Sequence, residues 1–202
     1  MLLLNLASNP LVLFSFLFAL VLAITIHEFS HAFVANSLGD PTAKYQGRIT
    51  LNPLAHLDPV GTLLLLIVGF GWGRPVPINP QYFTRPAFDE LLVALSGPAS
   101  NFIIAAVAGF LTRFTGDSLI ITQILAVTVE INVVLMLFNL IPIPPLDGSK
   151  IFRVFLGENA FRTLESYSLP LILILMFLLQ ASPLGNFLSS AISQLANFFV
   201  SI

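Results

Sequence analysis

Two histidines and a glutamate lie inside an apolar stretch of the chain, "LAITIHEFSHAFVANSLG" at residues 22–39. His27 and His31 are four residues apart, so on a helix both imidazoles lie on one face and can reach a single ion. Glu28 stands beside the pair, close enough to contact a water bound to that ion. This is the H-E-x-x-H pattern of zinc hydrolases, in which the metal lowers the pKa of its water to roughly 7 and the glutamate takes the proton.

The apolar surroundings make a chance occurrence of this pattern a poor explanation. An ionisable side chain at the centre of a bilayer costs roughly 2.5–3.5 kcal/mol or more, and such residues are functional by default. The pattern therefore predicts a metal site with hydrolytic chemistry inside a membrane.

A catalytic zinc takes three protein ligands and a water, so a third ligand is needed. The chain contains no cysteine, which leaves histidine and carboxylate. Four residues outside the motif qualify: His56, Asp58, Glu130 and Asp147. Asp147 follows a proline-broken helix end in "PPLDG" and is expected in the same membrane half as the motif. His56 is the rival third ligand, because histidine is a common zinc ligand.

Composition indicates a membrane protein. Of 202 residues, 56% are apolar and 9% are charged, whereas soluble domains carry about 25% charged residues. A chain with so few charges cannot cover a soluble surface, so the lipid bilayer must cover much of it. The net charge of -2 argues against a nucleic-acid partner, and the lack of cysteine excludes disulfides and thiolate metal sites.

The fold class predicted is an all-α polytopic membrane protein with about four to five transmembrane helices in a single domain over residues 1–202. The apolar runs of the sequence, and the glycines and prolines that bound them, predict where the helices begin and end. We expect spanning helices at 10–38, 88–114, 118–141 and 167–181, a loop at 142–149, an interfacial helix at 150–166, and an apolar segment at 184–202 that either spans or lies in the interface.

The segment 60–80 is too short to span, and the glycines at 69, 71 and 73 break any helix in it. We expect a re-entrant loop that ends in a short edge strand, because prolines are tolerated at edges. An unwound substrate could pair with this edge by strand addition. Gly71, Gly73, Val76 and Ile78 are the substrate-binding candidates that this hypothesis provides.

Basic residues predict the orientation. Seven of the eight lysines and arginines fall in the connections at 39–87 and 142–166, and Arg113 alone falls in the opposite connection. The positive-inside rule places both groups in the cytoplasm. We therefore expect a multi-pass protein of the cell membrane with a site that opens toward the cytoplasm.

Two motifs together resemble the site-2 protease family of intramembrane zinc metalloproteases, peptidase family M50. "HEFSH" is similar to that family's first motif, and "NLIPIPPLDG" matches N-x-x-P-x-x-x-L-D-G through Asn139, Pro142, Leu146, Asp147 and Gly148. The glycine-rich segment and "SGPASN" at 96–101 also resemble the family's core. The resemblance covers nearly the whole chain and is to a minimal form without PDZ or CBS domains.

The resemblance implies one zinc ion per chain, bound by His27, His31 and Asp147, with Glu28 as the general base. Asn139 would hold the substrate backbone or the developing oxyanion. The partner would be a transmembrane segment of another protein, and the resemblance leaves its identity and the oligomeric state open.

Asn101 in "SGPASN" has two interpretations, helix packing and a polar contact toward the site or substrate. Two other functions stay open beside proteolysis. The first is a membrane zinc or ion transporter, since transporters also carry His and acidic groups in the membrane. The second is an inactive relative that binds membrane proteins, although such a scaffold would not need Glu28.

Overall fold

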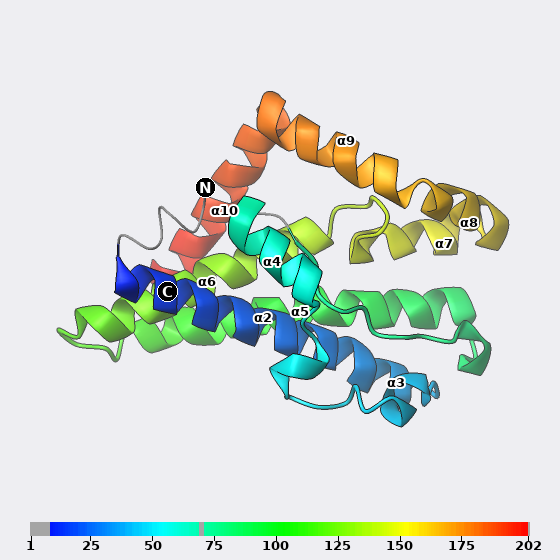
Figure 1. Ribbon diagram of the computed structural model, residues 1–202, viewed down its shortest axis with the longest axis horizontal. Helices are drawn as coiled ribbons and strands as arrows, with labels where there is room; N and C mark the ends of the chain where they lie inside the picture. The colour runs from blue at the N-terminus through cyan, green and yellow to red at the C-terminus, as the bar shows by residue number, and fades with distance from the viewer. Residues whose placement is uncertain (1–8, 69–70, 202) are drawn as a thin grey trace.

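The computed structural model describes residues 9–68 and 71–201, and helices dominate this part of the chain (Figure 1). The α-helices are α2 (Pro10–Ser37), α3 (Thr42–Tyr45), α4 (Pro59–Val68), α5 (Pro86–Thr112), α6 (Leu119–Asn139), α7 (Ile151–Leu156), α8 (Glu158–Ser166), α9 (Ser168–Ala181) and α10 (Pro183–Ser201). Short 3-10 turns lie at Pro53–Ala55, Pro80–Tyr82 and Asp147–Lys150.

Helices α2, α5 and α6 pack against one another and form the trunk of the molecule (Figure 1). Small residues on their facing sides, such as Ala19, Ala23, Ala35 and Ala105, are fully buried. Small side chains let helix backbones approach closely in a membrane, where packing rather than the hydrophobic effect holds helices together. The trunk is therefore the part of the fold best suited to fix side chains in place.

The three trunk helices are also the helices in the described chain that are individually long and apolar enough to cross a membrane. Helices α8 and α9 pass the same test only as a pair, bent by 64°. The prediction of an all-α polytopic membrane protein is confirmed, with three spans or four if the bent pair counts as one. Helix α10 does not meet the test, so the described residues give no support for a fifth span.

Local signals explain the helix ends. The Asn9 side chain accepts hydrogen bonds from the Leu11 and Val12 amides, and Pro10 opens α2. Gly39, with a φ of 108°, follows its last turn, as expected for a left-handed helix stop. The predicted interfacial helix at 150–166 is broken into α7 and α8 at Gly157, whose φ is 78°.

The segment predicted as a re-entrant loop with an edge strand consists of helix α4 followed by extended chain. Its contact with another extended segment is one isolated antiparallel bridge, Leu57 to Gly73. Prolines at 75, 77 and 80 lack the amide hydrogen that a ladder needs, so no regular strand forms among the described residues of this segment. Gly69 lies outside the described residues.

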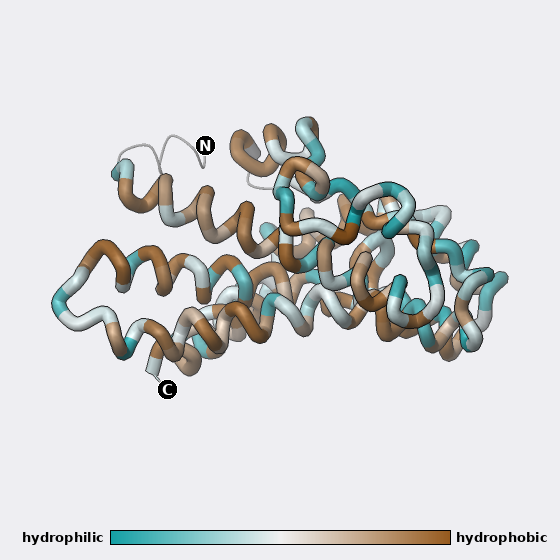
Figure 2. Tube along the Cα trace, turned by 90° about the horizontal axis from the view of Figure 1, so that it is seen from below, coloured by the Kyte–Doolittle hydropathy of each residue, from teal (hydrophilic) through white to brown (hydrophobic). Residues whose placement is uncertain are grey.

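The remaining helices form an arm beside the trunk. Helices α7 and α8 lie at one end, α9 crosses the molecule, and α10 returns against α5 and α6 (Figure 1). Figure 2 shows hydrophobic residues along the long helices and hydrophilic residues gathered at the end that carries α7 and α8. On α9, Ile172 and Leu175 pack against Leu146, so the arm covers the loop that carries Asp147.

Candidate metal centre and active-site cavity

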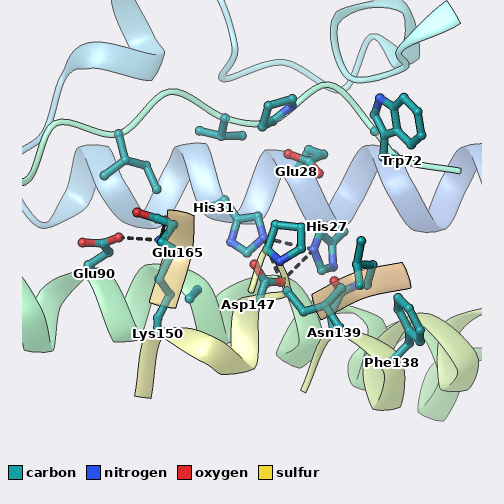
Figure 3. A pocket seen from close by; sticks show the side chains of 18 of the residues that line it. His27, Glu28, His31, Trp72, Glu90, Phe138, Asn139, Asp147, Lys150 and Glu165 are labelled. Atoms are coloured by element: carbon teal, nitrogen blue, oxygen red, sulfur yellow. Dashed lines mark hydrogen bonds and ion pairs between the residues drawn. The ribbon is translucent and has the colours of Figure 1, made fainter. Parts of the chain in front are cut away.

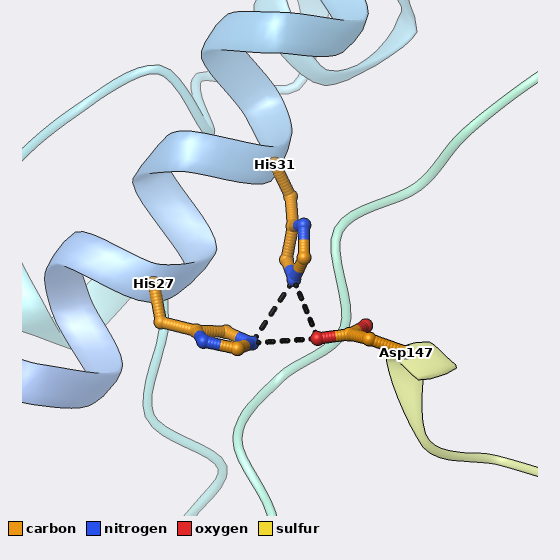
Figure 4. Close-up of side chains that lie close together, drawn as sticks. All are labelled: His27, His31 and Asp147. Carbon is orange, nitrogen blue, oxygen red and sulfur yellow. Dashed lines mark hydrogen bonds and ion pairs between the residues drawn. The ribbon is translucent and has the colours of Figure 1, made fainter. Parts of the chain in front are cut away.

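His27, His31 and Asp147 meet at one point between α2 and the turn after α6 (Figure 4). His27 Nε2 lies 3.1 Å from Asp147 Oδ2, His31 Nε2 lies 3.3 Å from the same oxygen, and the two nitrogens are 3.0 Å apart. Three ligands of a tetrahedral zinc at about 2.0–2.2 Å are separated by roughly 3.3–3.6 Å, so the triangle needs only a slight expansion to hold the ion.

The hydrogen bonds of the two Nδ1 atoms show which nitrogen of each histidine carries a hydrogen and which presents a lone pair. His27 Nδ1 lies 2.7 Å from Asn101 Oδ1, and His31 Nδ1 lies 2.8 Å from the Val93 carbonyl oxygen. Each Nδ1 therefore donates, and each Nε2 of a neutral ring presents a lone pair to the other and to a carboxylate. Asp147 Oδ2 is buried without a hydrogen-bond donor. Converging lone pairs repel unless a cation lies between them, which fits the donor set of a zinc site.

Gly97 of α5 makes room for the two rings. A Cβ at this position would lie 2.5 Å from His27 Cε1 and 2.6 Å from both His27 Nε2 and His31 Cε1. The glycine allows α5 to pass directly beneath the metal ligands.

A cavity of about 1150 Å³ opens beside this centre (Figure 3). Its walls include the three metal-binding candidates, the catalytic candidates Glu28 and Asn139, and the substrate-binding candidates Gly71, Gly73, Val76 and Ile78. At one end lies an ionic cluster in which Lys150 Nζ contacts Glu90 Oε1 at 3.0 Å and Arg153 pairs with Glu90. This cluster ties α7 to α5.

Glu28 and Asn139 face the cavity from different elements. Figure 3 shows Glu28 on the side of α2 that faces the extended segment, where a Cβ on Gly73 would lie 3.3 Å from its Oε1. Asn139 Nδ2 donates one hydrogen to the Leu135 carbonyl at 3.0 Å. An amide nitrogen has two hydrogens, so one remains for a group in the cavity.

Side chains from the connection after α2 support the extended segment from behind. Arg48, 4% exposed, donates to the Pro75 carbonyl at 3.0 Å and to the Arg74 carbonyl at 2.5 Å. Asp40, fully buried, accepts from the Asn79 amide at 2.7 Å. These contacts fix both ends of the stretch that contains Val76 and Ile78.

Two sequence-based candidates are not among the cavity-lining residues. Asn101, for which helix packing and a polar contact toward the site or substrate are the two interpretations, is fully buried and makes its polar contact with the metal-binding candidate His27. His56, the rival third ligand, is fully buried with its Nε2 2.7 Å from the Thr50 carbonyl oxygen. It is not part of the metal-binding group found in the described residues.

The sequence does not single out several of the buried polar residues that contribute to the site, among them Asp40, Arg48 and Asn132. Asp40 and Arg48 occur in a polar connection where charged residues are common, so the sequence gives no sign of their burial. A signal exists for Asn132, which is a polar residue inside an apolar span. Glu130 is exposed in the structure.

Comparison with known proteins identifies the family. The model of peptidase family M50 matches residues 115–180. The chain is 41% identical over 191 residues to a Bacillus subtilis protein named "Putative zinc metalloprotease YwhC", covering 88% of this chain and 85% of that protein. It is 31% identical over 152 residues to Rip2 of Mycolicibacterium smegmatis, which carries the same description, with coverage of 71% and 58%.

A more distant relative is "Zinc metalloprotease MJ0392" of Methanocaldococcus jannaschii, 28% identical over 148 residues, which cover 73% of this chain and 35% of that protein. No solved structure gives a significant match. The geometry of the metal centre agrees with the description that these relatives share. On the extent and identity of the first match, the chain belongs to the M50 family of zinc metalloproteases.

Proposed function

We propose that this chain is an intramembrane metalloprotease that hydrolyses peptide bonds in or near transmembrane segments of other membrane proteins. The observation that carries the proposal is the shared cavity. The group of His27, His31 and Asp147 opens into the same space as Glu28, and that space lies among helices apolar enough to cross a membrane. One such metal-binding group is found in the described residues, which favours a catalytic site over an ion path with several stations.

The proposed chemistry assigns a task to each residue around the cavity. Zinc, when bound by His27, His31 and Asp147, supplies a polarised water and a Lewis acid for the scissile carbonyl. The carboxylate of Glu28 removes a proton from the attacking water and returns it to the leaving amine. The remaining Asn139 amide hydrogen is available to the substrate carbonyl oxygen.

The substrate backbone is proposed to lie along the extended segment. Arg48 and Asp40 bind this segment from behind, while Val76 and Ile78 contribute to the cavity wall. Gly73 leaves the space in front of Glu28 free of a side chain. A strand added here would lie beside Glu28, in the cavity that the metal-binding group also lines.

Glu28→Gln tests the proposed reaction. The substitution removes the base and leaves the three metal-binding candidates, so zinc content should stay near wild type while cleavage falls by about 10²–10⁴-fold. Purified protein would be assayed for metal content and for product size after co-expression with single-span membrane proteins. Glu130→Gln, an exposed glutamate on α6, is the matched control and should cleave normally. Normal cleavage by Glu28→Gln would rule out the mechanism.

Cysteine crosslinking tests strand addition. Because the native chain has no cysteine, single cysteines at Val76 or Ile78 can be paired with cysteines along a substrate, in the Glu28→Gln background. We expect crosslinks that alternate every second substrate residue, since side chains of a strand alternate between faces. A period of three to four residues would instead show that the substrate docks as a helix.

Reporter fusions test the proposed orientation in the cell membrane. The positive-inside rule predicts cytoplasmic signals after Arg85 and Arg162 and an external signal near Gly116, between α5 and α6. An external signal after Arg85 would contradict a site that opens toward the cytoplasm.

A further inference from the structure

Beneath the metal centre, a chain of hydrogen bonds runs through three helices. His27 Nδ1 on α2 contacts Asn101 Oδ1 on α5 at 2.7 Å, and Asn101 Nδ2 contacts Asn132 Oδ1 on α6 at 2.8 Å. Asn132 Nδ2 then donates to the Thr128 carbonyl at 2.8 Å. Both asparagine side chains are fully buried, so water does not compete for these bonds.

These hydrogen bonds can run in one direction only, because the series ends on the Thr128 carbonyl, which can only accept a hydrogen bond. The Thr128 carbonyl requires Asn132 to present its amide nitrogen, which turns Asn132 Oδ1 toward Asn101. That oxygen requires Asn101 to present its own nitrogen and to turn its oxygen toward His27. A second acceptor, the Ala23 carbonyl at 3.4 Å from Asn101 Nδ2, imposes the same orientation.

The orientation of the Asn101 amide determines the tautomer of the metal-binding candidate His27. An oxygen facing His27 Nδ1 accepts the hydrogen of that nitrogen, so the neutral ring carries its lone pair on Nε2, which faces Asp147 and His31. A partner on the second nitrogen of a ligating histidine fixes both its tautomer and its ring orientation. His31 reaches the same state directly through the Val93 backbone carbonyl.

We propose that Asn132 is a positioning residue for zinc binding, which acts through Asn101 to hold His27 in the Nδ1–H tautomer. The assignment refines the proposed function, since it concerns the same metal site, but zinc binding and tautomer can be measured without any substrate. Asn132 makes its hydrogen bonds to Asn101 and Thr128 and none to a metal ligand, so its polar group acts on the metal site through the amide of Asn101.

Asn132→Leu is the primary test because it keeps a similar volume and removes both the donor and the acceptor. We expect its zinc affinity to fall about tenfold, and that of Asn101→Leu to fall toward about 100-fold, in competition with a chromophoric chelator on detergent-purified protein. Gln123→Leu makes the same polar-to-apolar change elsewhere on α6 and should leave the affinity unchanged.

Asn132→Asp separates the hydrogen-bond role from packing. A neutral carboxylic acid can donate to Thr128 and accept from Asn101, so this variant should bind zinc about as well as the wild type. Equal losses in the Asp and Leu variants would show that only side-chain packing matters and would overturn the proposal.

The tautomer itself provides a readout that a merely structural role would not move. With three histidines in the chain, ¹⁵N-histidine NMR of the zinc-free protein can distinguish the ring nitrogens. We expect a hydrogen on His27 Nδ1 in the wild type and in Asn132→Asp, and its partial loss from Nδ1 in Asn132→Leu, while His31 stays unchanged in all three. A His27 ring that carries its hydrogen on Nε2 alone in the zinc-free wild type would overturn the proposal, whether or not any variant folds. If the wild type shows no proteolysis while the His27 tautomer and the zinc affinities are as expected, the result would count against the proposed function alone.

Discussion

The two walls of the cavity are built in different ways. On the metal side, His27 and His31 project from the trunk helix α2 and are anchored by buried groups of the neighbouring trunk helix α5. On the opposite side, the extended segment 71–79 rests on one backbone bridge and on the side chains of Arg48 and Asp40.

The difference matches what each wall must do. A metal centre needs its ligands fixed to within about 0.5 Å, which packed helices with satisfied hydrogen bonds provide. A surface that pairs with an incoming strand must instead leave backbone groups unused, so it cannot be buried in a sheet of its own. Substitutions on the two sides should therefore separate metal binding from substrate handling.

The largest effect is expected on the metal side, for Gly97→Ala. The added methyl group would overlap both histidine rings, with contacts of 2.5–2.6 Å, so the rings must leave the positions in which they face Asp147. Zinc affinity should fall by at least about 100-fold, which chelator competition would measure.

Gly109→Ala is the matched control for that substitution. It lies on the same helix, and its new Cβ would lie 2.3 Å from the Phe199 carbonyl oxygen of α10, so it should lower the unfolding temperature. Because this contact is remote from the histidines, zinc affinity should stay near wild type. Loss of zinc in both variants would show that any packing change on α5, even one far from the histidines, disrupts the metal site.

A smaller effect is expected on the other side, for Arg48→Met. This change removes the charged donor of the Arg74 and Pro75 carbonyls, and a hydrogen bond to a charged group contributes about 1.5–3 kcal/mol. The catalytic efficiency kcat/KM should fall about tenfold, mainly through a higher KM, with zinc content unchanged. Arg48→Lys, which can keep one donor, should give an intermediate value, and zinc loss in either variant would contradict the separation of the two walls.

The smallest effect is expected for Asp40→Asn. One carboxylate oxygen accepts from the Asn79 amide and the other from the Thr42 amide, so an asparagine must turn a donor toward one of them. We expect a loss of about two- to fivefold in kcat/KM and no change in metal content. A loss larger than that of Arg48→Met would show that the Asn79 end, rather than the Arg74 end, is the critical support.

The sequence predicts the metal side of the cavity more completely than the side formed by the extended segment. The i, i+4 spacing of the histidines dictates a common helix face, and the proline-broken helix end before Asp147 is visible in the chain. The contacts of Asn132 and Arg48 depend on which helices and loops become neighbours, which no local pattern encodes. The edge strand was expected from the prolines, yet the same prolines reduce its pairing in the described residues to one bridge.

The central claim is that Asp147, together with His27 and His31, binds the metal of this M50 protein. The most direct measurement is the zinc content of purified Asp147→Ala and His56→Ala beside the wild type. We predict about one zinc per chain in the wild type and in His56→Ala, and little or none in Asp147→Ala, since a catalytic zinc needs three protein ligands. Undiminished zinc in Asp147→Ala, or its loss in His56→Ala alone, would contradict the account.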